Sequence, residues 1–305
     1  MVSVIIPNYN HAAFLRQRIE TVLGQSYQDL EIILLDDAST DNSVQIMQEF
    51  EHHPKVSALI VNGENSGNTM RQWRKGLERA TGHWIWFAES DDYSDPEFLQ
   101  ASVQATQLAS SAVMVATHSR VVKESAVSNE NLDLPNNLLG FHRGDEVNSN
   151  YLVYENPFKN ASALLISRHA LLQLGWEDLS HFQWTGDWKM YSGLLRQGDF
   201  YGVDRHLNYY RRHGNATSNS RYDKGFLFKE GLPLTLALLN HYECGFRPRL
   251  KHVLVWSRHL LNKYRADWQQ RKFRFYIFRP FTFCILLYLV LPMVALKKLL
   301  TKQRR

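Results

Sequence analysis

The sequence predicts an α/β protein whose doubly wound, mostly parallel sheet is flanked by helices and followed by a helical C-terminal tail. Short apolar runs alternate with amphipathic stretches through residues 2–88, which is the pattern of repeated strand–helix units. Polar side chains follow the end of each run. Crossovers between such strands are right-handed, so their carboxyl ends lie along one edge of the sheet, where ligands bind in doubly wound folds.

The first three strands are expected at residues 2–6, 31–35 and 56–61, where β-branched and aliphatic residues form short runs. Each run leads into an amphipathic helix, and the second of these helices is expected to be capped by Ser39 or Asp41. The apolar faces of the three helices are Leu15, Ile19, Val22 and Leu23; Val44, Met47 and Phe50; and Met70, Trp73, Leu77 and Ala80.

The fourth strand, expected at residues 84–88, stops abruptly in acid. Its aromatic run is followed by Glu89, Asp91 and Asp92. Taken alone, such a triplet is typical of a solvated turn before a helix, here the helix expected to begin at Phe98. Carboxylates crowd together only where positive charge compensates them. Their place at the end of a strand therefore favours a divalent cation that pairs them with nucleotide phosphates.

Beyond residue 110 the alternation is less regular. Further strands are expected at 113–116, 161–166 and 201–203, and helices at 169–174, 191–195 and within 226–265. The polar residues 125–150 predict a long irregular insertion. We expect four parts: two halves of the α/β region at 1–110 and 111–220, a helical region at 221–271 and a basic, apolar segment at 272–305.

The charge of the chain is strongly asymmetric. Residues 245–305 contain 15 Lys and Arg and a single acid, although the whole chain has a net charge of only +5. Residues 280–296 hold no charged side chain and are flanked by basic residues on both sides. Such a tail favours an anionic membrane surface over nucleic acid as a partner. A segment lying in the interface, a single span and a soluble helix all remain open, because the run is at the short limit for a span.

The two cysteines, Cys244 and Cys284, form neither a disulfide framework nor a metal-binding spacing, which fits a reducing compartment. The chain starts directly in a strand, so no secretory signal is expected and the membrane contact is predicted on the cytoplasmic side. The first strand is followed by neither a dinucleotide-binding glycine pattern nor a phosphate-binding loop. A nucleotide would therefore be held by acids and a metal instead.

Six segments stand in a set order between Val2 and Ser218. They read VSVIIPNYN, LLDDASTDNS, ENSG followed by Arg71, FAESDDY, TGDW and YYRRHGNATS. In this order and spacing they resemble the family 2 inverting glycosyltransferases of the GT-A fold. The resemblance implies a nucleotide-diphosphate sugar as donor and Mg²⁺ or Mn²⁺ as cofactor. It makes residues 1–110 the nucleotide-sugar-binding half and residues 111–220 the acceptor-binding half with the catalytic base.

The resemblance also implies a role for each matching residue. Pro7 and Tyr9 would line the base pocket, Asp37 or the adjacent Asp36 would contact uracil or ribose, and Arg71 would approach the base or a phosphate. Asp91 and Glu89 would hold the metal, with Asp92 on the donor sugar or the metal, and Arg211 and His213 would meet the diphosphate or its metal. Asp187 would be the catalytic base, and Trp184 is the candidate for stacking on the acceptor.

Two positions depart from the family pattern. The first acid of the metal motif is Glu89, and Gly186 stands where the family usually has an acid before the base. Structural roles also remain open, because Asp37 and Asp187 are both suited to capping a helix and His213 lies in a basic segment.

The predicted chemistry is a single displacement. A divalent ion and cationic side chains would stabilise the leaving nucleoside diphosphate, and a carboxylate would deprotonate the attacking hydroxyl. The acceptor would be a glycan or a lipid-linked intermediate of cell-surface polysaccharide synthesis. One alternative is an inactive binding or scaffold protein, which Gly186 favours. A nucleotidyltransferase is the other, but it would need a glycine-rich, lysine-bearing loop that residues 8–11 do not provide.

Overall fold

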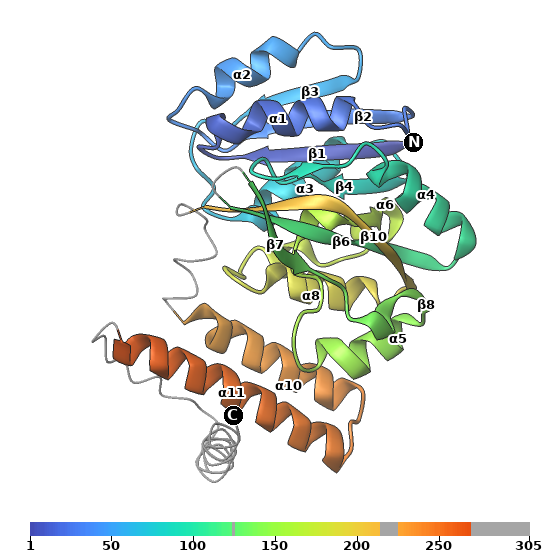
Figure 1. Cartoon of the computed structure of the whole chain (residues 1–305), viewed down its shortest axis with the longest axis vertical. Helices are drawn as coiled ribbons and strands as arrows, with labels where there is room; N and C mark the ends of the chain where they lie inside the picture. The colour runs from blue at the N-terminus through green and yellow to red at the C-terminus, as the bar shows by residue number, and fades with distance from the viewer. Residues whose placement is uncertain (124–125, 214–224, 270–305) are drawn as a thin grey trace. The chain divides into compact units, whose positions relative to one another are not determined.

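The computed structural model describes residues 1–123, 126–213 and 225–269. Within them the chain divides into two compact units, one of Met1–Asn148 with Asn156–Gly231 and one of Ser149–Glu155 with the chain from Leu232 onward. The first unit is built on one sheet (Figure 1). Its strands are β1 (Val2–Asn8), β2 (Leu30–Asp36), β3 (Val56–Val61), β4 (Trp84–Phe87), β5 (Tyr93–Ser94), β6 (Ala112–Lys123), β7 (Ala126–Leu132), β8 (Gly140–His142), β9 (Leu164–Ser167) and β10 (Asp199–Arg212).

The first four strands are parallel and run in the order β3-β2-β1-β4. This confirms the predicted doubly wound half of the sheet. Strand β1 is buried along its whole length, as its β-branched sequence predicts. Its register places Asn8 opposite Asp36, so the carboxyl ends of β1 and β2 lie side by side at the edge where a ligand is expected.

Four helices connect and follow these strands, as the apolar periodicity predicts. They are α1 (Ala12–Leu23), α2 (Ser43–Phe50), α3 (Thr69–Arg79) and α4 (Phe98–Leu108). Asn42 directly precedes α2, but its side chain makes no capping hydrogen bond. Of the two predicted caps, Asp41 accepts hydrogen bonds from the backbone N–H of Ser43 at 3.0 Å and of Ala12 at 2.9 Å. It therefore joins the starts of α1 and α2.

The alternation of side chains along β1 separates two layers of the core. Val2, Val4 and Ile6 belong to a cluster that also contains buried residues of α1, α2 and α4. Ile5 points the other way and lies against Gly76 of α3, where an added Cβ would come within 2.4 Å of the Ile5 side chain. Helix α3 thus packs closely onto the opposite face of the sheet.

The second half of the sheet is mixed. Strand β9 is antiparallel to both β4 and β6, whereas β6 and β10 are parallel. The prediction of an irregular stretch at 125–150 is wrong, because β7 pairs with β6 and β8 pairs with β10. The alternating hydrophobic signal was missing there because β7 is exposed along most of its length. Short helices complete this unit: η1 (Asn136–Leu138), α5 (Gly144–Val147), η3 (Ala161–Ala163), α6 (Arg168–Leu172), α7 (Trp176–Leu179), α8 (Gly186–Leu194) and η4 (Leu227–Gly231).

The second unit contains α10 (Leu232–His241) and α11 (Phe246–Gln269), and the π-helical turn η2 (Asn148–Leu152) lies at its boundary with the first. His252 of α11 is buried and lies 2.8 Å, through its Nε2, from the hydroxyl of Thr235 on α10. The predicted membrane segment 272–305 lies outside the described residues. Among the helices that are described, none is both long and apolar enough to cross a bilayer.

Candidate active site at the acidic turn

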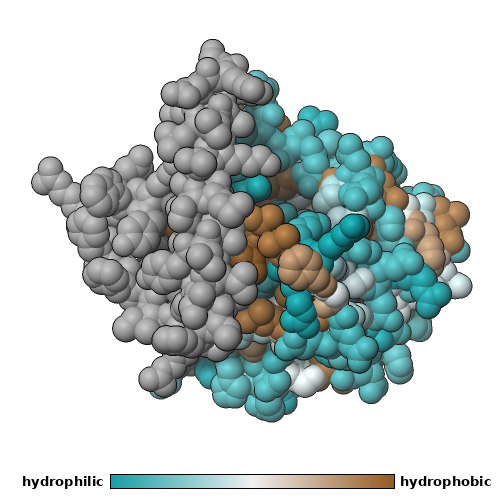
Figure 2. All heavy atoms as spheres, turned by 90° about the horizontal axis from the view of Figure 1, so that it is seen from below, coloured by the Kyte–Doolittle hydropathy of each residue, from teal (hydrophilic) through white to brown (hydrophobic). Residues whose placement is uncertain are grey.

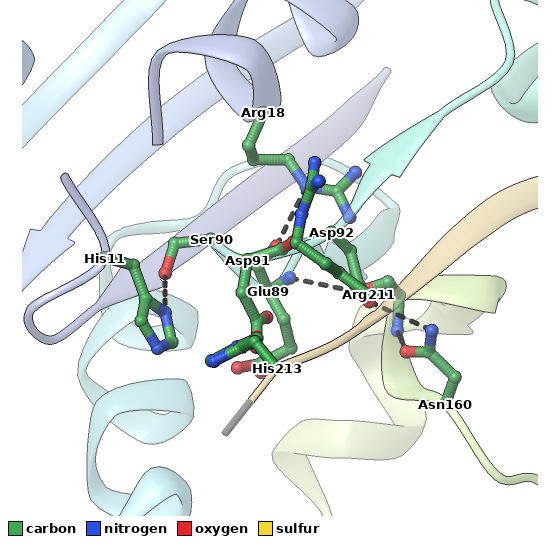
Figure 3. Close-up of polar contacts among 10 residues, drawn as sticks. His11, Arg18, Glu89, Ser90, Asp91, Asp92, Asn160, Arg211 and His213 are labelled. Atoms are coloured by element: carbon green, nitrogen blue, oxygen red, sulfur yellow. Dashed lines mark hydrogen bonds and ion pairs between the residues drawn. The ribbon is translucent and has the colours of Figure 1, made fainter. Parts of the chain in front are cut away.

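The acidic turn, Glu89–Asp92, joins β4 to β5 and is closed by a hydrogen bond from the Asp92 N–H to the Glu89 carbonyl at 3.2 Å. Directly after it, Tyr93 of β5 pairs with Tyr209 in the antiparallel strand β10. Because the two strands run in opposite directions, the end of β10 lies beside the turn. Arg211 and His213 thereby reach residues more than a hundred positions earlier in the chain (Figure 3).

Glu89, the first acid of the turn, is held inward. Its Oε1 accepts a hydrogen bond from the indole Nε1 of Trp73 at 2.9 Å, and that indole stacks on Phe87 with ring centroids 4.4 Å apart. Burial, with a contribution from the charge of Asp91, raises the pKa of Glu89 to about 8. This carboxyl group is therefore mostly protonated at neutral pH.

Arg18 is the buried cation of the site. It comes from α1 and is fully inaccessible to solvent. Its Nε donates to the carbonyl of Glu89 at 2.9 Å, and its guanidinium lies 5.5 Å from the ring centre of Trp86. Burial lowers the pKa of Arg18 to about 10, against the opposing charges of Asp92 and Asp91. Arg18 thus supplies the positive charge that allows carboxylates to crowd in this turn.

Asp91, His213 and His11 converge in front of the turn (Figure 3). Oδ2 of Asp91 lies 3.0 Å from Nε2 of His213, and both side chains are only partly exposed. His11, which precedes α1, has its Nδ1 2.9 Å from the hydroxyl of Ser90. Burial alone would raise the pKa of Asp91, but the hydrogen bond from His213 and the charge of His11 lower it from its ordinary value. Among the described residues these three form the one set whose ligand atoms all lie within 4.8 Å of each other.

Asp92 and Arg211 stabilise the buried side of the turn. Asp92 accepts hydrogen bonds from the side chain of Asn160 and from the backbone N–H of Arg211, both at 2.9 Å. Burial and the neighbouring charge of Asp91 raise the pKa of Asp92 to about 6. The guanidinium of Arg211 donates to the Asp91 carbonyl at 2.9 Å and to the Gln17 side chain at 2.7 Å. Arg211 therefore positions the turn in this structure.

Asp37 holds the loop that follows β3. Its carboxylate accepts hydrogen bonds from Asn62, Ser66 and Gln72 at 2.7 to 2.9 Å, including one from the backbone N–H of Ser66. Arg71, on the exposed side of α3, donates to the Ser66 carbonyl at 3.4 Å. It also lines a hollow of about 360 Å³ with residues of α3 and α7, and none of the other predicted site residues lines that hollow. The loop after β3 thus contacts both Asp37 and Arg71 through Ser66.

Asp36 lies deeper than Asp37 and is fully buried. It accepts hydrogen bonds from the Asn8 side chain at 2.9 Å and from the Ser39 N–H at 2.8 Å. Asp36 therefore fixes the loops after β1 and β2. Of the two residues predicted to line the base pocket, Pro7 is buried within β1, whereas the side chain of Tyr9 is 45% exposed at the adjacent edge.

Asp187 stands in the first turn of α8. Its carboxylate accepts hydrogen bonds from the Trp188 N–H at 2.7 Å and from the Asn156 side chain at 3.3 Å. Burial raises the pKa of Asp187 to about 6. At the preceding Gly186, an added Cβ would lie 2.8 Å from Cγ of Met70. The absence of an acid at position 186 is therefore accompanied by a bulky side chain, that of Met70 on α3, packed against this position.

The segment before Asp187 is fixed by a distant acid. The carboxylate of Glu230 accepts hydrogen bonds from the backbone N–H groups of Gln183, Trp184 and Thr185 at 2.8 to 2.9 Å. The ring of Trp184 is partly exposed. Glu230 thus sets the backbone that presents the candidate acceptor-stacking residue next to the candidate base.

Four residues of this site were not predicted from the sequence: His11, Arg18, Asn160 and Glu230. A signal existed for Arg18, because it interrupts the otherwise apolar face of α1 and a buried arginine needs nearby carboxylates. His11, Asn160 and Glu230 reach the site through long-range strand and loop contacts, and nothing local marks them.

Comparison with known proteins identifies the family of this chain. Residues 3–172 match the model of glycosyl transferase family 2. TuaG of Bacillus subtilis, a glycosyltransferase named for teichuronic acid biosynthesis, is 26% identical over 227 residues, which cover 73% of this chain and 83% of TuaG. The range matched by the family model takes in the acidic turn and the loops after β1, β2 and β3.

Solved structures agree on the fold. TarS of S. aureus, residues 1–349 in complex with UDP-GlcNAc, superposes with a TM-score of 0.62 at 18% identity, covering 85% of this chain and 71% of that one. Mannosyltransferase PcManGT from Pyrobaculum calidifontis, in complex with GDP-Man and Mn²⁺, gives a TM-score of 0.50 at 15% identity, covering 95% and 86%. The predicted GT-A type of fold is confirmed. The chain belongs to glycosyl transferase family 2, as its six motifs predict.

Proposed function

We propose that this glycosyltransferase moves a sugar from a nucleoside diphosphate to a hydroxyl acceptor with inversion, and that it requires a divalent metal. The observation that carries the proposal is the meeting of Asp91 with His213 at the carboxyl ends of the parallel strands. A carboxylate and an imidazole there suit a cation bound beside a diphosphate. TarS and PcManGT were solved with nucleotide sugars, which supports a donor of this class.

In this proposal the loops after the first three strands hold the nucleotide. Asp37, directly after β2, and Arg71, in the first turn of α3, contact the base, ribose or a phosphate, and Pro7 and Tyr9 line the base pocket. Asp36 stabilises these loops by accepting a hydrogen bond from the side chain of Asn8. Asp92 faces the donor sugar or the metal. Arg211 contributes positive charge while it holds the acidic turn.

A divalent ion, when bound, would neutralise charge on the leaving diphosphate. Asp91 and His213 are the proposed ligands, and Glu89 is the remaining candidate. Asp187 accepts the proton of the acceptor hydroxyl. Its pKa of about 6 leaves it ionised at neutral pH yet still basic enough to take a proton. The single displacement then needs no protein nucleophile.

The acceptor is proposed to be a glycan or a lipid-linked intermediate of surface polysaccharide synthesis, which the name of TuaG supports. The membrane face is proposed to be cytoplasmic. Figure 2 shows apolar side chains exposed among hydrophilic ones on one face of the molecule. On α11 the exposed large apolar side chains are Phe246, Leu250 and Leu254. They repeat every fourth residue, and Arg247 and Lys251 lie exposed beside them. This basic, apolar stripe suits an anionic lipid surface.

The test is nucleotide release from a panel of UDP-, GDP-, dTDP- and CMP-sugars, with Mn²⁺, Mg²⁺ or EDTA. One donor class should turn over slowly with water as acceptor, and EDTA should abolish the release. Proton NMR should show the inverted anomer as the first sugar product. Asp91→Asn and Asp187→Asn should each lose activity, whereas Asp204→Asn, at an exposed position, should not.

Each alternative predicts a different outcome. A scaffold protein would bind a nucleotide, seen as a raised melting temperature, without turning over any donor. A nucleotidyltransferase would release pyrophosphate from a nucleoside triphosphate. Retention of the donor's anomeric configuration would contradict the proposed single displacement.

A further inference from the structure

We propose that His11 is a third protein ligand of the divalent ion, beside Asp91 and His213. This inference rests on the proposed function and deepens its metal site. His11 lies at the carboxyl end of β1, immediately before α1, and not in either motif from which metal ligands were predicted. The ion would then be held by residues from three separate parts of the chain.

The distances fit such a site. Nε2 of His213 and Oδ2 of Asp91 are 3.0 Å apart, which is about the separation of two adjacent ligands each ~2.1 Å from one ion. One ligand atom from each of His11, Asp91 and His213 lies within 4.8 Å of the other two. The imidazoles of His11 and His213 meet nearly at right angles, with their centres 5.4 Å apart. Small side-chain rotations would bring all three groups onto a common ion.

The surroundings of His11 select one of its nitrogens. Nδ1 lies 2.9 Å from the hydroxyl of Ser90, a residue of the acidic turn that is almost fully buried. Because this contact occupies Nδ1, Nε2 is the nitrogen left for coordination. Metal-bound histidines are commonly oriented in this way, by a hydrogen bond at the other ring nitrogen. Ser90 thus acts as a positioning residue for His11.

Glu89 is less suited to the same role. Its carboxyl group is held inward by a hydrogen bond of 2.9 Å from the indole of Trp73. It does not belong to the set of converging ligand atoms. The position that the sequence assigned to Glu89 in the metal shell is therefore filled more naturally by His11.

The ligand set has a chemical consequence. Two imidazoles and one carboxylate leave about three of six coordination positions open, enough for diphosphate oxygens and a water molecule. Imidazole nitrogens favour Mn²⁺ and later transition metals over Mg²⁺, which prefers oxygen. We therefore expect the full-length protein to bind Mn²⁺ in the absence of nucleotide, and to prefer it strongly over Mg²⁺.

The experiment measures Mn²⁺ binding to the full chain by electron paramagnetic resonance, without nucleotide and then with UDP. His11→Ala should weaken Mn²⁺ binding by at least about tenfold. Pulsed measurements should detect nitrogen coupling from two imidazoles in the wild-type protein and from one in His11→Ala. His11→Asp should retain binding but shift the preference toward Mg²⁺. His52→Ala, at an exposed histidine, is the matched control and should behave as wild type.

The outcomes separate the two proposals. Equal Mn²⁺ affinity and equal nitrogen coupling in wild type and His11→Ala would overturn the role of His11, even if donor turnover persists. Loss of folding in His11→Ala would appear in circular dichroism, and His11→Asp would then carry the test. A wild-type protein that binds no Mn²⁺, with or without UDP, overturns the metal site as well as His11.

Discussion

The indole of Trp73 and the carboxyl group of Glu89 form a hydrogen bond of 2.9 Å at the point where the fourth strand becomes the acidic turn. It ties α3 on one face of the sheet to the first acid of the proposed metal motif. Because Trp73 also stacks on Phe87, the bond holds a carboxyl group against an aromatic layer. Glu89 thereby has a structural partner that its place in the motif does not suggest.

Glu89→Gln should stabilise the protein increasingly as the pH rises. An unfolded Glu89 loses its proton near pH 4.5, whereas the folded group keeps its proton until about pH 8. Folding therefore becomes less favourable with rising pH across this window, and glutamine removes that penalty while its oxygen still accepts from Trp73. Melting temperatures at pH 5 and pH 8 should show a variant advantage only at the higher value. A difference that does not depend on pH would show that Glu89 is ionised in the folded protein.

Turnover should fall in acid because Asp187 must be deprotonated to act as a base. With its pKa raised to about 6, kcat/KM should drop roughly tenfold per pH unit below that value and level off above it. Asp187→Asn should lower kcat by about 10² to 10⁴-fold. It should also remove the decline of kcat/KM at acidic pH. The pH dependence of donor release in both proteins is the measurement. A decline that persists in Asp187→Asn would assign the titration to another group.

Gly186→Ala should destabilise the protein by about 1–3 kcal/mol, because the new Cβ would lie 2.8 Å from Cγ of Met70. The close contact is specific, so Met70→Ala should relieve part of the cost. Denaturant unfolding of both single variants and the double variant gives the coupling, which we expect to exceed about 0.5 kcal/mol. Simple additivity would mean that the backbone, rather than Met70, excludes a side chain at position 186.

Glu230→Ala should loosen the segment that carries Trp184. Three backbone N–H groups lose their charged acceptor, so the free energy of unfolding should fall by at least about 2 kcal/mol. Glu230→Gln should cost less, since an amide oxygen still accepts. Kinetics should show a raised KM for acceptor or a lowered kcat, whereas Glu243→Gln, at an exposed position, should change neither. Unaltered kinetics in a destabilised Glu230→Ala would restrict the residue to a structural role.

Replacing Leu250 and Leu254 together by glutamate should reduce binding to vesicles that contain phosphatidylglycerol. Both leucines are about 40% exposed on α11, and the new charges oppose both apolar insertion and attraction to anionic lipid. Sedimentation with vesicles should show at least about a tenfold weaker partition. Leu108→Glu, at a leucine 74% exposed on α4, is the control and should bind like wild type. Equal binding by all three proteins would exclude α11 from the membrane contact.

The parallel half of the fold follows from local pattern, because buried parallel strands are continuous apolar runs that end in turn residues. The motif acids could be found in the same way, since Asp91 stands four residues after the strand ending at Phe87. The local sequence pattern does not determine strand register, that is, which residues of two paired strands lie opposite each other. His213 meets Asp91 because β5 pairs with β10, and β5 is only two residues long. His11 and Glu230 escaped prediction for the same reason, since their partners lie 79 and about 45 residues away in sequence.

The buried guanidinium of Arg18 has a consequence for the charge balance of the turn. With Glu89 protonated, Asp91 and Asp92 carry two negative charges, and Arg18 and Arg211 carry two positive ones. The turn is thus close to neutral before anything binds. A divalent ion would leave it with a surplus of about two positive charges, and a diphosphate is the group that cancels such a surplus. The ion and the nucleotide should therefore strengthen each other's binding by the same factor, as thermodynamic linkage requires.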